Sequence, residues 1–507
     1  MNDGGAILLT GATGFVGHVL LAELLRRGHA CIALVNRPDC AGPQLTRLLA
    51  DLDIDAEAAR RAGQFHLLAG RLPDPLPATT GVPVRCVVHA AACTRFDPDA
   101  AGEPMRTNAE GTRRLLEWMS THEIRNLHLV STAFVCGRTS VSPEQPLATP
   151  PQFHNAYEHS KWLAEVAARQ WQQADARRHC TIHRPSIVVG DHTTGRTTRF
   201  SGLYLMFRAA DILSRIVGAR PEDRAHVPLR IACRPDDRVN IIPVDHVAAT
   251  MADIIEHPDL QGRIYHHVHP DPPTNAEIRT AIEAAFDLAG GVFVDPDTVA
   301  EHDLNDIERS FNNAIRVIRP YLTDAVTFRR ANVAAVEDRF ARTCPRWDGD
   351  AFRRLIDFAA AARFGRSPAR DAVAPAPLAE AHPCAVYFEQ YLPHRVADSR
   401  IARLAALTTT VRFAITGVPD GEWVCRFDAG QLVEVRRGCN GLREDFTYRT
   451  GLDGFWDVVT ARVDPQQVFL EGRAELSGDI EQALKMGVIL REFNLEHPWQ
   501  PEGEGHD

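Results

Sequence analysis

The sequence predicts an α/β protein whose first half is a Rossmann-type, doubly wound parallel sheet, followed by a helical lobe and a separate α+β domain. Three features predict this organisation: short apolar runs alternate with longer amphipathic segments, a glycine-rich turn follows the first run, and a stretch rich in proline and alanine divides the chain. At 507 residues, the chain also exceeds what one hydrophobic core usually supports.

Composition excludes several classes of function. The formal net charge of -10 offers no basic surplus for phosphate neutralisation, so we expect no nucleic acid partner. No run approaches the roughly 20 apolar residues that span a bilayer, and the opening residues lack the basic segment of a secretion signal. The 11 cysteines are scattered without C-x-x-C spacing, which argues against disulfides and against a metal site. We therefore expect a reducing, cytoplasmic setting.

The alternating segments of the first half predict strands of one sheet, with helices on both faces. The first helix is expected over residues 16–27, and Gly28 follows its basic end as a C-terminal cap. Strands are expected at 6–10, 31–35, 86–89 and 127–131, with further strands at 181–183, 239–242 and 263–268.

Changes of pattern divide the chain into five parts. After the α/β domain, helical spacing dominates; a linker rich in proline and alanine follows, and then strand-like runs with Asp-Gly and Ala-Gly breaks that indicate antiparallel hairpins. We expect an α/β domain at 1–300, a helical extension at 301–366, the linker at 367–384, the α+β domain at 385–495 and a disordered acidic tail at 496–507.

A glycine-rich turn, TGATGFVG, joins the first strand to the first helix. Gly11, Gly14 and Gly17 omit side chains where a backbone must approach a pyrophosphate, whose charge a helix N-terminus stabilises. Because the motif lies between a strand and a helix, it predicts a dinucleotide site rather than an ordinary tight turn.

The residues after the second strand indicate which dinucleotide binds. NAD sites usually have a carboxylate there for the ribose 2′-hydroxyl, whereas this chain has Asn36 and Arg37. Arginine pairs with a 2′-phosphate, so NADPH and NADP+ are the favoured cofactors. The alternative is that Arg37 is a solvated loop residue.

Tyr157 and Lys161 begin a predicted helix and lie four residues apart, on one helix face. The ammonium group is expected to lower the pKa of the phenol, so that Tyr157 exchanges a proton with a substrate oxygen, and also to hold the nicotinamide ribose. Upstream, a buried strand ends at Ser131 and Thr132, where Thr132 is the expected donor to an oxyanion. Alternatively, the spacing is a coincidence and the hydroxyl groups only terminate a strand.

These motifs resemble, in order, those of extended short-chain dehydrogenases/reductases. TGATGFVG, VVHAAACTRFD, TNAEGTRRLLEW, VSTAFVCG, YEHSK and HRPSIVVGDHTTG carry the resemblance, which covers most of residues 6–365. More narrowly, the chain resembles fatty acyl-CoA reductases and the thioester reductase domains of carboxylic acid reductases and peptide synthetases. The resemblance implies catalytic roles for Thr132, Tyr157 and Lys161, and cofactor contacts from Gly11, Thr13, Gly14, Phe15, Gly17, Arg37, Ala91, Lys161 and Pro185.

One segment departs from the family pattern. Where the family usually has Gly-Asp-Leu after the third strand, with the aspartate near the adenine, this chain has Gly70, Arg71 and Leu72. We still expect Arg71 and Leu72 at the cofactor site, where Arg71 also favours a phosphorylated ribose.

The carboxyl-terminal part resembles sterol carrier protein type 2 domains, through TVRFAIT, GEWVCRFDAGQLVEVRRG and DPQQVFLEGRAELSGDIEQAL. That resemblance implies an apolar tunnel for a lipid or acyl chain, which would keep a poorly soluble substrate close to the enzyme. A role in homodimer formation is the alternative. The aromatic residues of this part either line such a tunnel or form an ordinary core: Phe413, Trp423, Phe427, Phe446, Phe455, Trp456 and Phe469.

Together, these features predict an enzyme that uses NADPH to reduce an acyl thioester, or the derived aldehyde, to an aldehyde or alcohol. The hydrophobic acyl group is expected on coenzyme A or an acyl carrier protein. One alternative is an NADP-dependent alcohol or ketone oxidoreductase that acts on a sterol-like or polyketide-like substrate. Another is a catalytically idle, nucleotide-sensing lipid carrier.

Overall fold

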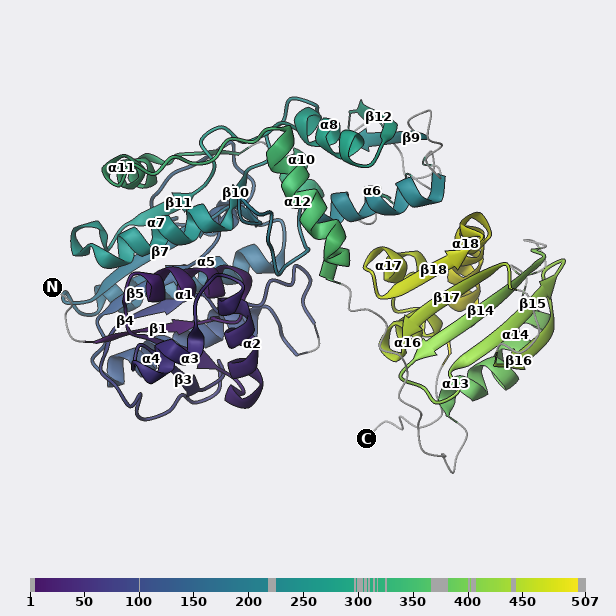
Figure 1. The fold of residues 1–507 in the computed structure, drawn as a ribbon, viewed down its shortest axis with the longest axis horizontal. Helices are drawn as coiled ribbons and strands as arrows, with labels where there is room; N and C mark the ends of the chain where they lie inside the picture. Colours follow the sequence, from purple (N-terminus) through teal and green to yellow (C-terminus); the bar gives the residue numbers. More distant parts are fainter. Residues whose placement is uncertain are drawn as a thin grey trace.

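The structure, a computed structural model, describes residues 5–99, 101–217, 225–295, 326–365, 382–399, 407–438 and 444–499. It also describes short pieces within 298–323 and the single residue Ala402. The predicted linker at 367–384 lies outside the described residues up to position 381, and residues 500–507 of the predicted tail lie outside them too. Figure 1 shows an amino-terminal lobe and a carboxyl-terminal lobe, each with its own sheet.

A seven-stranded parallel sheet forms the centre of the amino-terminal lobe, in the order β3-β2-β1-β4-β5-β7-β11. From β1 the chain first adds β2 and β3 on one side and then β4, β5, β7 and β11 on the other side, which is the doubly wound topology predicted from the sequence. The strands are β1 (Ala6–Thr10), β2 (Cys31–Val35), β3 (Phe65–Ala69), β4 (Val84–His89), β5 (Asn126–Val130), β7 (His179–Pro185) and β11 (Ile264–His267).

Helices cover both faces of this sheet, because successive side chains of its buried strands point to opposite sides. In β1, Ile7 and Leu9 join one hydrophobic cluster, and Ala6 and Leu8 join another. The first cluster is covered by α1 (Phe15–Arg26), α2 (Pro38–Ala50), α3 (Ala56–Arg61) and α7 (Val244–Glu256), and the second by α4 (Gly111–Thr121) and α5 (Ala156–Gln173).

The cap predicted after the first helix is confirmed. Gly28 has a φ of +82°, a conformation that glycine adopts without strain, and its backbone N–H donates to the Leu25 carbonyl. The strand predicted at 239–242 is also present, but β10 (Ile241–Pro243) pairs with β8 (Ile187–Val189) outside the main sheet.

The substrate lobe, defined here as the elements around the third hydrophobic cluster, is not purely helical. It contains a parallel pair, β9 (Ala225–Ala232) and β12 (Leu288–Val294), that the sequence analysis missed. Gly290 interrupts the apolar alternation of β12 where the register shifts, and its φ is +106°. The helices of the substrate lobe are α6 (Tyr204–Val217), α8 (Asn275–Ala285), α10 (Arg319–Thr323) and α12 (Gly349–Ala361). Outside this cluster, α11 (Ala331–Arg339) packs on β11. A short parallel pair joins β6 (Val141–Ser142) to β13 (Thr327–Phe328).

The carboxyl-terminal lobe is an α+β domain with its own aromatic core. Its sheet has the order β16-β15-β14-β17-β18, and the two predicted hairpins are the antiparallel pairs of β15 with β14 and β16. Trp499, beyond the last helix, packs on Tyr391, so buried chain extends into the predicted tail. The strands are β14 (Thr409–Thr416), β15 (Glu422–Asp428), β16 (Gln431–Arg437), β17 (Phe446–Gly451) and β18 (Ala474–Gly478), with helices α13 (Pro383–Val386), α14 (Leu392–Asp398), α16 (Leu452–Val459), α17 (Pro465–Leu470) and α18 (Ile480–Glu496).

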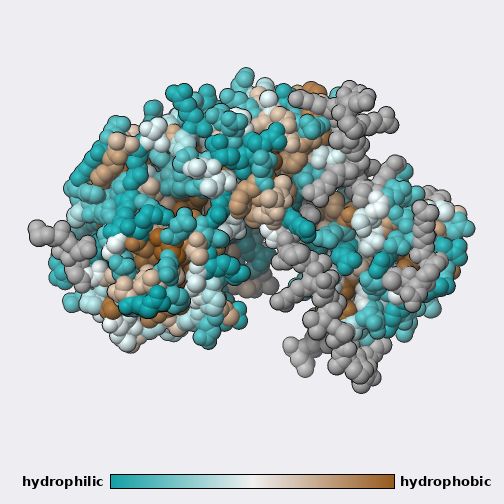
Figure 2. Space-filling model, in the orientation of Figure 1, coloured by the Kyte–Doolittle hydropathy of each residue, from teal (hydrophilic) through white to brown (hydrophobic). Residues whose placement is uncertain are grey.

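The face of the molecule in Figure 2 is mainly hydrophilic, with smaller apolar areas on both lobes. Among the described residues, none of the helices combines the length and apolar character needed to cross a bilayer.

Three buried histidines form a chain across β5, β7 and β11. The Nδ1 atom of His128 lies 3.1 Å from Nε2 of His183, and Nδ1 of His183 lies 2.9 Å from Nε2 of His267. Burial lowers the pKa of His128 to about 3, and it holds the pKa values of His183 and His267 well below their usual range. Neutral rings each carry one N–H donor and one acceptor, so the chain suits uncharged histidines.

Acidification is therefore expected to destabilise the amino-terminal lobe. Unfolded histidines take up protons near pH 6.5, whereas the folded ones stay neutral, so the free energy of unfolding falls as the pH drops. Each such histidine contributes about 1.4 kcal/mol per pH unit between pH 6.5 and its folded pKa. Urea unfolding should show a constant midpoint above about pH 7 and a falling one below about pH 6. The control His179→Asn, at an exposed position, should keep this slope; a midpoint independent of pH would contradict the prediction.

Candidate active site

The glycine-rich turn joins β1 to α1 at the carboxyl edge of the main sheet. A Cβ atom on Gly17 would lie 2.0 Å from the Gly11 carbonyl oxygen, and one on Gly11 would lie 2.5 Å from the Ala91 nitrogen. Gly14 is the N-cap of α1 and has no side chain to cap the helix, so the first backbone amides of α1 are available to an anion.

Gly17→Ala is expected to weaken dinucleotide binding by a factor of about 5 to 150. The new methyl group must displace the backbone of the turn, and such overpacking costs about 1–3 kcal/mol. Titration calorimetry with NADPH measures the change. Gly349→Ala is the matched control, because a Cβ there meets nothing within 4 Å; equal affinity in both variants would contradict a site at this turn.

A buried chain of hydrogen bonds holds the turn against the neighbouring strand. The Ala91 amide donates to the Thr10 hydroxyl at 3.1 Å, and that hydroxyl lies 2.7 Å from Nδ1 of His89. The Thr112 hydroxyl lies 3.1 Å from Nε2 of His89 and donates to the Asn108 carbonyl at 2.5 Å. Since burial lowers the pKa of His89 to about 3, the ring is neutral and its Nε2–H donates to Thr112.

The two expected phosphate-binding arginines follow adjacent strands at the carboxyl edge of the sheet. Arg37 follows β2, Arg71 follows β3, and both are exposed. The Gly70 amide donates to the Val35 carbonyl at 2.9 Å, which joins the ends of these strands. Leu72 is instead buried in the core, where it packs against helix α4.

The other expected cofactor contacts also lie along this edge. Thr13 is half-buried in the glycine-rich turn, and Phe15 is the half-buried first residue of α1. Pro185 is buried at the end of β7, next to His267 of β11. These positions surround the ends of the central strands, where α/β proteins bind dinucleotides.

The expected catalytic residues meet near the ends of β5 and α5. Asn155 caps α5 by accepting the Glu158 amide at 3.0 Å, which places Tyr157 and Lys161 in the first two turns. Lys161 is 2% exposed, and its Nζ donates to the Val130 carbonyl at 2.6 Å. Thr132, two residues further along, is buried beside them.

The electrostatics of Tyr157 differ from the expectation. Burial raises the pKa of the Tyr157 phenol to about 12, and the cation that opposes this rise is Arg199 rather than Lys161. Burial also lowers the pKa of Lys161 to about 8, against the opposing effect of Glu165. The phenol is therefore protonated at neutral pH and suited to donate a proton.

A cavity of about 460 Å³ opens beside Tyr157 and Thr132. The Arg199 guanidinium donates to the Thr94 hydroxyl at this cavity. Besides Thr132 and Tyr157, the polar lining residues are Thr94, Arg95, Asp97, Ser186, Arg199 and Ser201. The apolar and aromatic ones are Phe96, Pro98, Phe134, Ile187, Val188, Leu205, Ile318 and Tyr321. The arrangement suits a carbonyl group that carries an apolar chain.

Sequence reasoning missed Arg199, Ser186 and Tyr321. Ser186 lies inside the Arg-Pro-Ser-Ile-Val string, so that motif was an available signal. Arg199 and Tyr321 lie far along the chain from Tyr157, and no local spacing connects them with it.

Two family models match the chain, one for each lobe. Residues 9–251 match the male sterility protein family, and residues 388–491 match the SCP-2 sterol transfer family. The amino-terminal lobe is therefore called the short-chain dehydrogenase/reductase domain, and the carboxyl-terminal lobe the sterol carrier domain, after the families that their sequences resemble.

Curated relatives and solved structures agree with this assignment. A non-canonical nonribosomal peptide synthetase, FrzA, of a Cladobotryum species is 29% identical over 54% of this chain and 26% of its own length. The aldehyde reductase lnaA of Aspergillus flavus is 25% identical over 63% of this chain and 31% of its own length. The chain thus spans less than a third of either relative.

Two solved structures share the fold of the short-chain dehydrogenase/reductase domain. The terminal R domain from the myxalamid PKS-NRPS biosynthetic pathway has a TM-score of 0.57 at 22% identity, over 72% of this chain and 92% of that chain. A thiolation-reductase di-domain from an archaeal nonribosomal peptide synthetase has a TM-score of 0.55 at 19% identity, over 72% of this chain and 78% of that chain.

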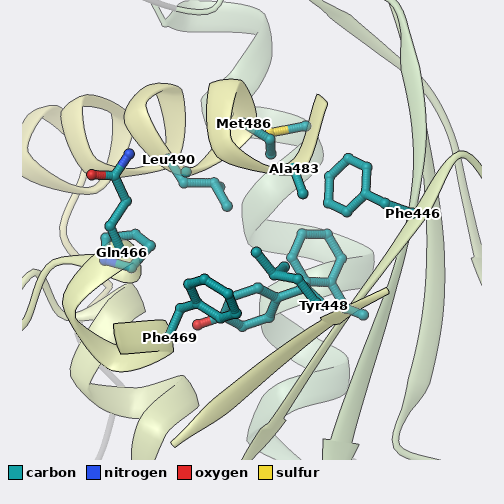
Figure 3. Close-up of a pocket in the computed structure, with 11 residues that line it drawn as sticks. Phe446, Tyr448, Gln466, Phe469, Ala483, Met486 and Leu490 are labelled. Carbon is teal, nitrogen blue, oxygen red and sulfur yellow. The ribbon is translucent and has the colours of Figure 1, made fainter. Parts of the chain in front are cut away.

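The sterol carrier domain has an apolar pocket between its sheet and helices α17 and α18 (Figure 3). Its free volume is only about 20 Å³, so a lipid chain requires the walls to separate. Phe413, Phe446 and Phe469 line this pocket, whereas Trp423, Phe427 and Phe455 are buried in the core and Trp456 packs against it. Phe413, Phe446 and Phe469 also belong to this core, so a tunnel for a lipid chain stays a prediction. The remaining lining residues are Tyr448, Pro465, Gln466, Leu476, Ala483, Met486, Gly487 and Leu490.

Proposed function

We propose that the short-chain dehydrogenase/reductase domain uses NADPH to reduce the carbonyl carbon of a hydrophobic acyl thioester, or of the derived aldehyde. The observation that carries this proposal is the cavity that Thr132 and Tyr157 line together with apolar and aromatic side chains. Relatives described as an aldehyde reductase and a peptide synthetase, and a structural neighbour described as a terminal R domain, support the same reaction class.

The residues of the cavity have complementary roles in this reaction. The glycine-rich turn would hold NADPH, which would supply a hydride to the carbonyl carbon. The Thr132 hydroxyl donates to the carbonyl oxygen, and the Tyr157 phenol transfers its proton to that oxygen as negative charge develops. Lys161 binds the ribose hydroxyls of the cofactor.

With a thioester, the first product is a hemithioacetal. Its C–S bond breaks, the hydroxyl proton passes to sulfur, and an aldehyde and a thiol leave. Reduction of the aldehyde to an alcohol would need a second NADPH in place of the NADP+ formed, and a proton from Tyr157 after the phenol has been reprotonated from solvent. The thiol is that of coenzyme A or of an acyl carrier protein, and the thiolation-reductase neighbour supports the carrier protein.

The preference for NADPH over NADH rests on Arg37 and Arg71. Both are exposed at the ends of adjacent strands, where a ribose 2′-phosphate can pair with two guanidinium groups. The residue before Arg37 is Asn36, so the usual carboxylate of NAD sites is absent from this position.

Absorbance assays with the purified full chain test this function. NADPH oxidation is expected with acyl-CoA, with acyl carrier protein thioesters or with long-chain aldehydes, and slower turnover with NADH. Activity confined to sterol-like or polyketide-like ketones and alcohols would replace the proposal with the oxidoreductase alternative. Cofactor binding without turnover on any carbonyl substrate would favour a nucleotide-sensing lipid carrier.

We propose that residues 385–495 bind the lipid chain of the substrate in the pocket of Figure 3 and keep it near the reductase cavity. Displacement of a fluorescent fatty acid by candidate lipids measures the binding of lipid to this domain.

The cysteines that the structure describes are all unpaired, which supports a reducing, cytoplasmic setting.

A further inference from the structure

A tyrosine of the substrate lobe bonds to the first turn of the helix that carries Tyr157. The Tyr321 hydroxyl, on α10, donates to Glu158 Oε1 at 2.7 Å. The same hydroxyl accepts the Nδ2–H of Asn155, the N-cap of α5, at 2.8 Å. Tyr321 also lines the cavity that contains Tyr157.

The direction of these hydrogen bonds follows from the chemistry of the groups. The Oδ1 atom of Asn155 accepts the Glu158 amide, so its Nδ2 is the atom left to donate to Tyr321. The single proton of the Tyr321 hydroxyl then points to Glu158. One phenol therefore binds both the cap of α5 and the residue that follows Tyr157.

Glu158 makes this contact costly to lose. Its side chain is fully buried, and both carboxyl oxygens lie 3.1 Å from Nδ1 of His154, whose backbone amide also donates to Oε2 at 2.8 Å. Without the Tyr321 hydroxyl, Glu158 Oε1 would lose its shortest hydrogen bond and keep only the contact with His154 Nδ1, unless a water molecule took the place of the hydroxyl.

Aromatic contacts continue the connection towards Tyr157. The Tyr321 ring lies 4.5 Å from that of Phe134 and 6.0 Å from that of Phe96, between ring centroids. The Phe96 ring lies 6.1 Å from that of Tyr157. The rings therefore fill the space between the lobe and Tyr157, and a displaced Tyr321 would loosen both contacts.

We propose that Tyr321 is a positioning residue for Tyr157, which clamps the first turn of α5 to the substrate lobe so that the phenol is held towards the cavity. The proposal rests on the proposed reductase function for its catalytic consequence. The clamp itself has a structural readout that does not need turnover.

Tyr321→Phe keeps the aromatic ring and removes the hydroxyl. We expect kcat to fall roughly tenfold, as for one hydrogen bond to a charged group, while KM for the carbonyl substrate changes less than about threefold. Hydrogen exchange of the backbone amides at 157–160 should become about tenfold faster, with or without cofactor. Asn155→Asp keeps an acceptor at the helix cap but has no hydrogen-bond donor for Tyr321, so it should change kcat and exchange in the same direction.

Tyr204→Phe is the matched control. It also removes a buried hydroxyl of the substrate lobe, one that accepts the Gly190 amide at 2.9 Å, but it does not contact α5. Unchanged kcat and unchanged exchange in Tyr321→Phe would overturn the proposal, and so would equal losses in Tyr321→Phe and Tyr204→Phe. If the natural protein reduces no carbonyl substrate and Tyr321→Phe still accelerates exchange at 157–160, the clamp stands and the proposed function fails.

Discussion

Replacing Tyr157 by phenylalanine is expected to lower kcat by a factor of about 10²–10⁴, the range that a well-placed general acid contributes. The phenol lies half-buried in the cavity beside Thr132, and its raised pKa of about 12 keeps the proton available at neutral pH. Phenylalanine retains the ring packing against Phe96 but has no proton to transfer.

Steady-state kinetics and cofactor titration together measure this effect. The affinity for NADPH should change little, because the glycine-rich turn and its backbone amides remain intact. Tyr391→Phe, in the carboxyl-terminal lobe, is the matched control and should keep full kcat. A Tyr157→Phe protein with undiminished turnover would remove Tyr157 from the mechanism.

The raised pKa of about 12 keeps the Tyr157 phenol protonated at pH 7, as a proton donor to a carbonyl oxygen must be. The sequence predicted the opposite shift, because the spacing of Tyr157 and Lys161 suggested that their charges interact. Spacing does not reveal that Lys161 donates to Val130 or that the phenol is desolvated.

Every strand of the main sheet except β3 was predicted, because these strands are mostly buried, whereas β3 is partly exposed. Buried strands appear as continuous apolar runs, and β1 and β2 have the predicted bounds. The pair of β9 and β12 escaped prediction, because β12 is partly exposed and has glycines at its bend. Local periodicity carries information on burial, and it fails where a strand is bent or solvated.

The residues of the candidate site also differ in how well the sequence predicts them. Thr132, Tyr157 and the glycines lie in motifs with short internal spacing, so the sequence alone identified them as candidates for the site. Tyr321 reaches Glu158 only through the folded substrate lobe, and nothing in the residues around it signals this contact. Leu72 matches the family pattern and is buried against α4, and its place at the cofactor site stays a prediction.

Arg184→Met is expected to lower the free energy of unfolding by about 3–5 kcal/mol, the largest stability effect that we predict. Arg184 and Glu165 are both fully buried, and the guanidinium donates to the two carboxyl oxygens at 2.9 and 2.7 Å. Methionine fills similar volume, so the cost comes mainly from a buried carboxylate left without its cation.

This ion pair also connects stability with the site. Arg184 belongs to β7 and Glu165 to α5, the helix that carries Tyr157 and Lys161, so the pair fixes the catalytic helix on the sheet. Urea unfolding measures the single variant against Arg184→Met combined with Glu165→Leu. The double variant should recover most of the loss, because the orphaned charge is gone. If the double variant is as unstable as the single one, the cost lies in packing and in the 3.3 Å bond from Arg184 to the Pro143 carbonyl, and the ion pair is not what holds α5.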